Sequence, residues 1–507
     1  MKRLYIKCIV VVTVLAQFLG ACSDDYLEVE PKGRSLEENY YRNADEVFNG
    51  LVAVYDVVGW VGSGFVTKIG AVNSASDDHY AGGGSSTDIT AFQVFNNYTL
   101  DPANGPQGEF WNLGFSGVFR ANILLSKIPD VNMDENLKTR FTAETKFLRA
   151  YFYFDLIRFF KNIPLLTEPV EPSNFYTVEQ NTREEVFAAI EADLQAAIPN
   201  LPVNLNLSTE AGRATQGAAR ALLGKVYLQQ EKFTQAAEQF AMVNGSTPGG
   251  TSELGGYKLL DNYGDLWVTS NKFNAESIFE VNKTSSSNAV WDCVGCTEGN
   301  VLNIMVNPRN YSANSENAPQ IVSGWSFFPI TQSLVDAFET GDKRYSYSVL
   351  NIDSLANAGA VSYAPGYMDT GYFIAKFIGK SEDQSTGGGN MELNFPQNIY
   401  EIRLADTYLL EAEALVRGGG DQNRAQALLD AVRERAGLSS VPANFENIMD
   451  ERRVELSSEG HRWFDLIRTG LAPQVLGEFG FVEGKNEYLP IPLLELTNTQ
   501  LEQDPAY

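Results

Sequence analysis

The chain has 507 residues, of which 44% are apolar and 20% are charged, so it can bury a large core and is not disordered throughout. Its formal net charge of −26 at pH 7 repels nucleic acid and anionic lipid head groups, and we therefore expect no nucleic-acid partner. Aromatic residues are numerous, with 30 Phe, 23 Tyr and 6 Trp, and they can supply both a core and flat binding surfaces.

Residues 1–21 have the pattern of a bacterial signal peptide. Three basic residues, Lys2, Arg3 and Lys7, precede a mostly apolar stretch of 12 residues (8–19). This stretch is too short to cross a bilayer core of about 30 Å. The sequence Leu-Gly-Ala-Cys at 19–22 resembles a lipobox, which implies cleavage before Cys22 and acylation of that cysteine. An ordinary secretory signal with an incidental cysteine is the alternative. We expect residues 22–40 to form a lipidated tether.

Helices are predicted on both sides of a long irregular segment. Apolar residues recur at helical spacing from about residue 45, and further helices are expected at about 109–127 and 136–161. Residues 59–108 between them are rich in Gly, Ser and Asn, and a long loop on an ordered scaffold is usually functional. Within this segment, Asp77 and Asp78 predict an exposed acidic loop, with a calcium contact as the less favoured alternative.

Two stretches have the spacing of tetratricopeptide helix pairs. A helix at about 182–198 begins with a capping box and leads to residues 216–248, where Gly224, Tyr227, Ala236 and Phe240 match the repeat in type and spacing. A second pair is expected at 399–436, with Asp421 capping its second helix. An ordinary alanine-rich helical hairpin is the alternative for both.

Residues 250–395 lack helical periodicity, apart from a short helix near 330–339, and predict a loop-rich cap with short strands. This segment contains Cys293 and Cys296, the two cysteines outside the first 22 residues. A disulfide is favoured in an oxidising exterior, with free thiols as the alternative. Zinc is disfavoured because two more ligands would be needed and the chain has only two histidines, His79 and His461.

The motifs, taken in order, resemble the SusD/RagB family. The matching segments are Phe147–Tyr151, Trp325 to Arg344, Ile402–Glu413, Glu451–Leu456, Glu459–Arg468, Tyr488–Pro492 and the last residues Gln503–Tyr507. The resemblance implies an all-α fold of tetratricopeptide-like repeats with a loop-rich, mostly irregular cap. It also implies a surface lipoprotein of the outer membrane that faces the cell exterior and partners a TonB-dependent transporter of the SusC type.

We therefore expect one compact fold with two regions. Residues 41–249 contain helix pairs, and residues 250–507 contain the cap and the final helices. Charged residues crowd the stretch 451–468, which we interpret as one helix carrying a buried or half-buried ion-pair network, because many of them stand three or four positions apart.

The resemblance implies a glycan site formed by aromatic residues on loops, but no fixed contact residues. Sugar rings offer C–H faces that stack on aromatic rings and hydroxyl groups that need polar partners, and two loops supply both kinds of side chain. The first contains Asp78, His79, Tyr80, Asn97 and Tyr98. The second contains Trp291, Arg309, Tyr311 and Trp325. Trp291 and Tyr80 are the favoured exposed platforms, whereas Trp325 lies in a family motif and favours the core.

We therefore predict a binding protein that captures oligosaccharide, is not an enzyme, and needs no cofactor or metal. The two histidines, and the lack of a P-loop or a His-Glu-x-x-His motif, disfavour the common catalytic arrangements. Three alternatives stay open: a peptide-capturing RagB-like protein, a surface glycoside hydrolase, and a scaffold that holds other proteins.

Overall fold

The computed structural model describes residues 40–61 and 65–507, so the signal peptide and Cys22 lie outside the described residues. Residues 43–507 form one compact unit. In this part of the chain no helix combines the length and the apolar character needed to cross a bilayer.

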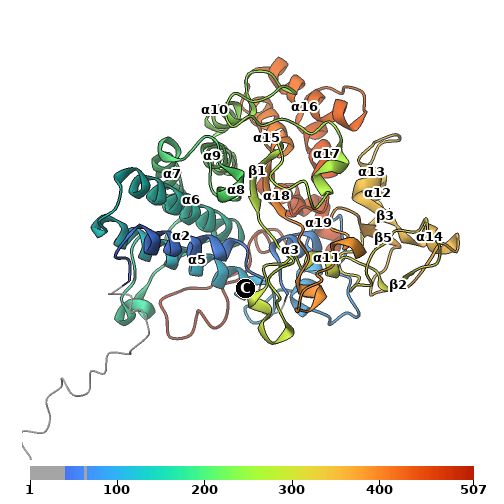
Figure 1. Cartoon of the computed structure of the whole chain (residues 1–507), viewed down its shortest axis with the longest axis horizontal. Helices are drawn as coiled ribbons and strands as arrows, with labels where there is room; N and C mark the ends of the chain where they lie inside the picture. Colours follow the sequence, from blue (N-terminus) through green and yellow to red (C-terminus); the bar gives the residue numbers. More distant parts are fainter. Residues whose placement is uncertain (1–39, 62–64) are drawn as a thin grey trace, which may run out of the picture. The chain divides into compact units, whose positions relative to one another are not determined.

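The helices of this unit pack against one another in chain order, as consecutive repeats do (Figure 1). Contacts run from α5 to α6, α7, α9, α10, α15 and α16, and α2 covers α5 and α6. Because α10 packs directly on α15, the residues between these two helices in the sequence form an insertion into the series of packed helices. The bounds are α2 Ala44–Val58, α5 Gln107–Lys127, α6 Glu135–Phe159, α7 Arg183–Ala197, α9 Gln216–Gln229, α10 Phe233–Asn244, α15 Leu404–Arg417 and α16 Gln422–Ala436.

Local chemistry explains the predicted repeat of α9 and α10. A Cβ on Gly224 would come within 2.6 Å of the Phe240 ring, so glycine is what permits the close approach of the two helices. Phe240 and Ala236 are fully buried. Predicted caps also form, since Thr182 and Glu185 make a capping box at α7 and Asp421 accepts two backbone N–H groups at α16. The all-α, tetratricopeptide-like fold is confirmed.

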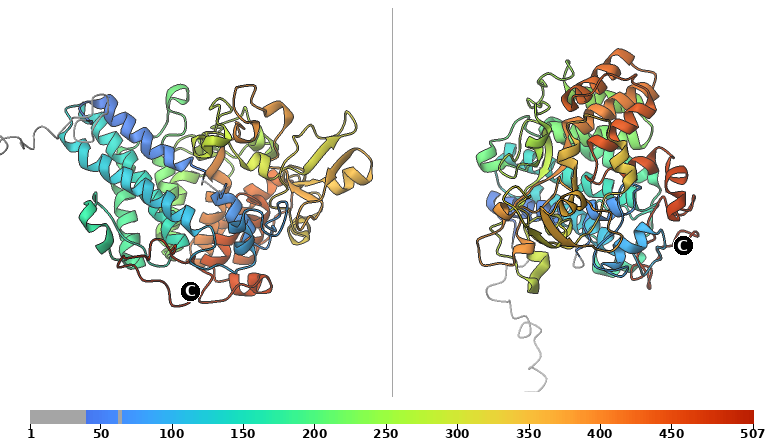
Figure 2. Two further views of the ribbon diagram at one scale, coloured as in Figure 1. Left: turned by 90° about the horizontal axis from the view of Figure 1, so that it is seen from below. Right: turned by 90° about the vertical axis from the view of Figure 1, so that its right-hand side faces the viewer.

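The inserted cap has little regular structure, as predicted, and holds three two-stranded antiparallel sheets. In Figures 1 and 2, β2 to β5 lie at the end of the unit away from α2 and α5. The pair β1–β6 joins an early segment of the insertion to its end, just before α15. The strands are β1 Ser277–Val281, β2 Arg309–Ala313, β3 Val349–Asn351, β4 Val361–Ala364, β5 Tyr372–Ile374 and β6 Ile399–Arg403; the short helices are α11 Leu302–Met305, α12 Gln332–Ala337, α13 Tyr345–Ser348 and α14 Ile352–Asn357.

The charged stretch near the C-terminus forms two helices, so the prediction of a single helix is wrong. Helix α17 (Phe445–Glu455) and helix α18 (Arg462–Arg468) are separated by a turn in which Ser458 and Gly460 have φ of 66° and 80°. Such backbone interrupts a right-handed helix. The predicted ion-pair network is present and buried, and α19 (Ala472–Leu476) follows it.

This network fastens the cap to the last helices. Arg403 pairs with Glu276, Glu455 and Glu459, and Arg344 pairs with Asp342, Glu451 and Glu455. Both guanidinium groups are at most 1% exposed. Burial alone would lower the pKa of Arg403, but the surrounding carboxylates raise it well above its usual value.

The segment 59–108 is more ordered than the sequence indicates. Its described residues contain two short helices that the pattern of Gly, Ser and Asn did not predict, α3 (Lys68–Ser74) and α4 (Thr90–Asn96). They also form isolated β-bridges, such as the one between His79 and Ile330. The acidic pair is buried, because Asp77 pairs with Arg462 and Asp78 pairs with Arg453. The prediction of an exposed acidic loop is therefore wrong.

A further short helix, α8, spans Leu207–Glu210.

Candidate functional site

Three aromatic rings from distant parts of the sequence meet at the surface of the cap, and we call Phe65, Trp291 and Trp325 the aromatic cluster. The two indoles lie nearly parallel, with centroids 6.2 Å apart and planes inclined by 28°. Phe65 is edge-on to both, at 5.9 Å from Trp291 and 5.4 Å from Trp325. Trp291 is 43% exposed, while the other two rings are half-buried.

Each ring is placed by its backbone. Trp291 opens the 3₁₀ turn Trp291–Cys296, and its backbone N–H donates to the Asn390 side chain. Phe65 has φ of 62° and leads into α3. The Trp325 backbone N–H donates to the carbonyl of Ile304, and Gly324 before it leaves no room for a side chain, because a Cβ there would come within 2.3 Å of the same carbonyl.

An ion pair borders the cluster on the side of Trp325. The Arg309 Nε donates to the carbonyl of Trp325 at 3.0 Å, and its Nη2 donates to Asp88 at 3.0 Å. Both charged side chains are about one-third exposed, at 34% and 33%. Aromatic faces bordered by charged and amide groups suit a ligand with apolar C–H faces and hydroxyl edges, which describes a sugar ring.

The structure therefore brings together three of the candidate residues, Trp291, Trp325 and Arg309. The expectation that Trp325 belongs to the core is wrong, since its ring is half-buried against Trp291. Sequence reasoning missed Phe65. Its position in the Gly-rich segment, with Gly62 and Gly64 before it, was a signal that could have drawn attention to it.

Four other candidates are structural, and their assignment to the ligand site is corrected here. Asp78 and His79 are each 1% exposed, Tyr98 is 5% exposed and Tyr311 is 9% exposed. Each side chain has one internal hydrogen-bond partner: Arg453 for Asp78, Ser458 for His79, and backbone carbonyl groups for the hydroxyls of Tyr98 and Tyr311. Asp78 Oδ2 and His79 Nδ1 are buried without a partner among the described residues. Burial lowers the pKa of His79 to about 3, so this ring stays neutral at ordinary pH.

The remaining two candidates are accessible but lie elsewhere. Asn97 is exposed at the end of α4, and its carbonyl packs close to Gly480 near the C-terminus. Tyr80 is half-buried, and its backbone N–H donates to the carbonyl of Pro329. Among the described residues, neither side chain makes a ring contact with the aromatic cluster, so their contact with a ligand stays a prediction.

The turn that carries Trp291 also contains the two cap cysteines. Cys293 and Cys296 are joined by a disulfide, which is the first of the alternatives that the sequence left open. Within the described ranges, no group of three or more His, Cys, Asp or Glu side chains is arranged to hold a metal ion.

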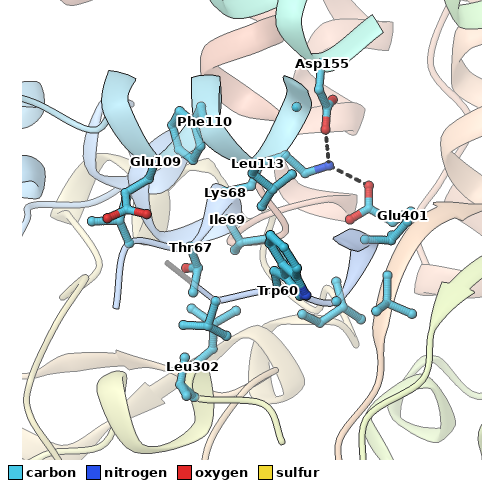
Figure 3. Close-up of a pocket in the computed structure, with 18 of the residues that line it drawn as sticks. Trp60, Thr67, Lys68, Ile69, Glu109, Phe110, Leu113, Asp155, Leu302 and Glu401 are labelled. Carbon is cyan, nitrogen blue, oxygen red and sulfur yellow. Dashed lines mark hydrogen bonds and ion pairs between the residues drawn. The ribbon is translucent and has the colours of Figure 1, made fainter. Parts of the chain in front are cut away.

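A cavity of about 240 Å³ lies beside α2, α5 and α6, and Asp155 and Glu401 are among the residues that line it (Figure 3). Lys68 bridges the pair, with its Nζ 2.9 Å from Asp155 and 2.7 Å from Glu401. Although burial opposes ionisation of Asp155, Lys68 and Arg158 hold its pKa below the usual value. A general acid needs a raised pKa, so the lowered pKa does not suit Asp155 to that role. The two ion pairs of Lys68 give Asp155 and Glu401 a structural role.

Comparisons with known proteins converge on one family. The profile described as "SusD family" matches residues 349–490, and one described as "Starch-binding associating with outer membrane" matches residues 25–228. A "SusD-like protein" of Bacteroides ovatus is 26% identical over 92% of this chain and 83% of its own length.

Solved structures agree with these matches. A "Laminarin binding SusD-like protein" is 51% identical, with a TM-score of 0.89, and covers 92% of this chain and 100% of its own. The surface glycan-binding protein A of Bacteroides thetaiotaomicron, solved with laminarihexaose, is 25% identical, with a TM-score of 0.81 and the same two coverages.

Proposed function

The chain belongs to the SusD family of glycan-binding proteins, and we propose that it captures a laminarin-type oligosaccharide on the aromatic cluster of Phe65, Trp291 and Trp325. The single observation that carries this proposal is the near-parallel pair of accessible indoles, bordered by Arg309 and Asp88. The choice of sugar rests on the relative that is 51% identical and is described as binding laminarin.

The aromatic cluster would hold the sugar by non-covalent stacking, without forming a covalent bond to it. Successive sugar rings lay their C–H faces on Trp291 and Trp325, while Phe65 packs edge-on and keeps both indoles in place. Arg309 and Asp88 offer a charged donor and a charged acceptor to hydroxyl groups at the rim. This set contains one carboxylate, Asp88, which is paired with Arg309, whereas glycoside hydrolysis uses two carboxyl groups, and this supports a non-catalytic role.

A direct binding assay tests the proposal against its rivals. We expect laminarihexaose to bind when it is titrated into the purified protein, and we expect no reducing ends to appear on long incubation with laminarin. A mixed peptide library should not compete with the hexasaccharide. Steady release of reducing ends that survives repurification would favour a hydrolase, and competition by peptides would favour the peptide-capturing alternative.

We also propose that Cys22 anchors the protein by acylation, on the evidence of the Leu-Gly-Ala-Cys sequence and of a family described as associating with the outer membrane. Several acyl chains hold a protein stably where one chain does so marginally. We expect Cys22→Ala to move the protein from the membrane fraction to soluble material. Unchanged fractionation, with the N-terminal peptide retained in mass spectra, would contradict lipid anchoring.

Membership of the family further supports a position on the cell exterior and a SusC-like TonB-dependent transporter as partner, to which the captured oligosaccharide is delivered. Extraction in mild detergent should recover the lipoprotein together with a large β-barrel protein. Recovery as a free monomer under several extraction conditions would count against this partnership.

A further inference from the structure

The turn that carries Trp291 is weakly attached to the rest of the cap. None of the residues from Trp291 to Cys296 is buried. Among the described residues, the Trp291 ring contacts the rings of Phe65 and Trp325, which are themselves only half-buried. The position of the indole therefore depends on the backbone of the turn and not on packing into the core.

Hydrogen bonds hold the two ends of this turn to the neighbouring segment. At the start, the Trp291 backbone N–H donates to the Asn390 side chain at 3.1 Å, and the Asn390 backbone N–H donates to Ala289 at 2.8 Å. After the turn, the Thr297 hydroxyl donates to the carbonyl of Leu393. Both ends are thus fixed on residues 390–393.

The middle of the turn lacks this support. Cys293 has φ of −141° and ψ of 74°, which is not helical, so the pattern of hydrogen bonds is interrupted there. Two backbone bonds link the turn to its flanking residues, from the Cys293 N–H to the Val290 carbonyl at 2.9 Å and from the Thr297 N–H to the Val294 carbonyl at 3.1 Å. The disulfide between Cys293 and Cys296 spans this interruption and closes the turn covalently.

We infer that the Cys293–Cys296 disulfide is a positioning element of the glycan site, which holds Trp291 parallel to Trp325 before the ligand arrives, so that glycan affinity depends on the oxidation state of this pair. The inference rests on the proposed function, because it needs the aromatic cluster to be the site of binding. It assigns the disulfide to ligand capture and not to the stability of the fold.

The physical reason is preorganisation. A cross-link removes conformations from the segment that it closes, and a ligand that binds a prearranged surface does not have to order that surface. Without the bond, Trp291 would leave its alignment with Trp325 for part of the time. We expect affinity for laminarihexaose to fall by about tenfold, mainly through faster dissociation. The melting temperature should stay close to that of the wild type, because the turn buries no side chain.

The test compares oxidised protein, protein reduced with dithiothreitol, and the Cys293→Ser/Cys296→Ser double variant. Dithiothreitol transfers two electrons to the S–S bond; two protons complete the two thiols, and the reagent becomes a cyclic disulfide. Reduced protein and the double variant should bind laminarihexaose equally and more weakly than oxidised protein. Reoxidation should restore the affinity of the wild type but should not change that of the double variant.

A double-mutant cycle shows whether the disulfide acts through Trp291. In a Trp291→Ala background, loss of the disulfide should have no further effect on affinity, since residues that act through one another are not additive. Additive losses, or a melting temperature that drops by many degrees on reduction, would overturn the inference. Equal affinity before and after reduction would also overturn it. If oxidised wild-type protein does not bind laminarihexaose at all, it is the proposed function that fails.

Discussion

Replacing Arg403 by methionine is expected to lower the free energy of unfolding by about 3–5 kcal/mol, because it removes one buried positive charge that three buried carboxylates share. Arg403 contacts Glu276, Glu455 and Glu459, all of which are buried. Glu276 retains Arg435, and Glu455 retains Arg344 and Arg435. Among the described residues, Glu459 retains only Lys376.

Denaturant unfolding of the variant and the wild type measures this effect. The matched control is Lys258→Met, because Lys258 forms an ion pair with Asp261 in which the two side chains are 44% and 90% exposed. An exposed pair contributes less than about 1 kcal/mol. If Arg403→Met were as stable as the control, the network would not be what fastens the cap to the C-terminal helices.

Removing both indoles of the aromatic cluster is expected to abolish measurable binding of the oligosaccharide. Each Trp→Ala change should weaken binding by about 1–3 kcal/mol, by analogy with base–aromatic stacking, or roughly tenfold to a hundredfold. We expect Trp291→Ala to leave the melting temperature nearly unchanged, since this ring is 43% exposed. Isothermal titration with laminarihexaose and thermal melting of the same samples provide the two readouts.

The control for this prediction is Tyr176→Ala. Tyr176 is 62% exposed and lies in the 3₁₀ helix Pro172–Thr177, between α6 and α7. The substitution therefore removes an accessible ring from the helical part of the protein. Its affinity should equal that of the wild type. Full affinity in the Trp291→Ala/Trp325→Ala variant would mean that the ligand binds elsewhere.

The sequence was most informative where structure depends on near neighbours. Spacing of apolar residues predicted α9 and α10, and short capping motifs predicted the starts of α7 and α16, because these features need only a few adjacent residues. The division of residues 445–468 into two helices was missed. It depends on positive φ at Ser458, a residue type that gives little sign of such a conformation.

The site was harder to predict because burial depends on distant partners. Asp78 and His79 stand in a polar, Gly-rich segment that suggests exposure, yet Arg453 and Ser458 from the far end of the chain cover them. Trp291, Trp325 and Arg309 were selected for their residue type and polar surroundings. That Phe65 joins the two indoles could not be predicted, since no local pattern relates residues so far apart in the sequence.

The structure of the protein with laminarihexaose, determined by crystallography, tests the central claim most directly. We expect sugar rings stacked on Trp291 and Trp325, with hydroxyl groups within hydrogen-bonding distance of Arg309 or Asp88. An oligosaccharide bound at another surface, with the aromatic cluster unoccupied, would contradict it.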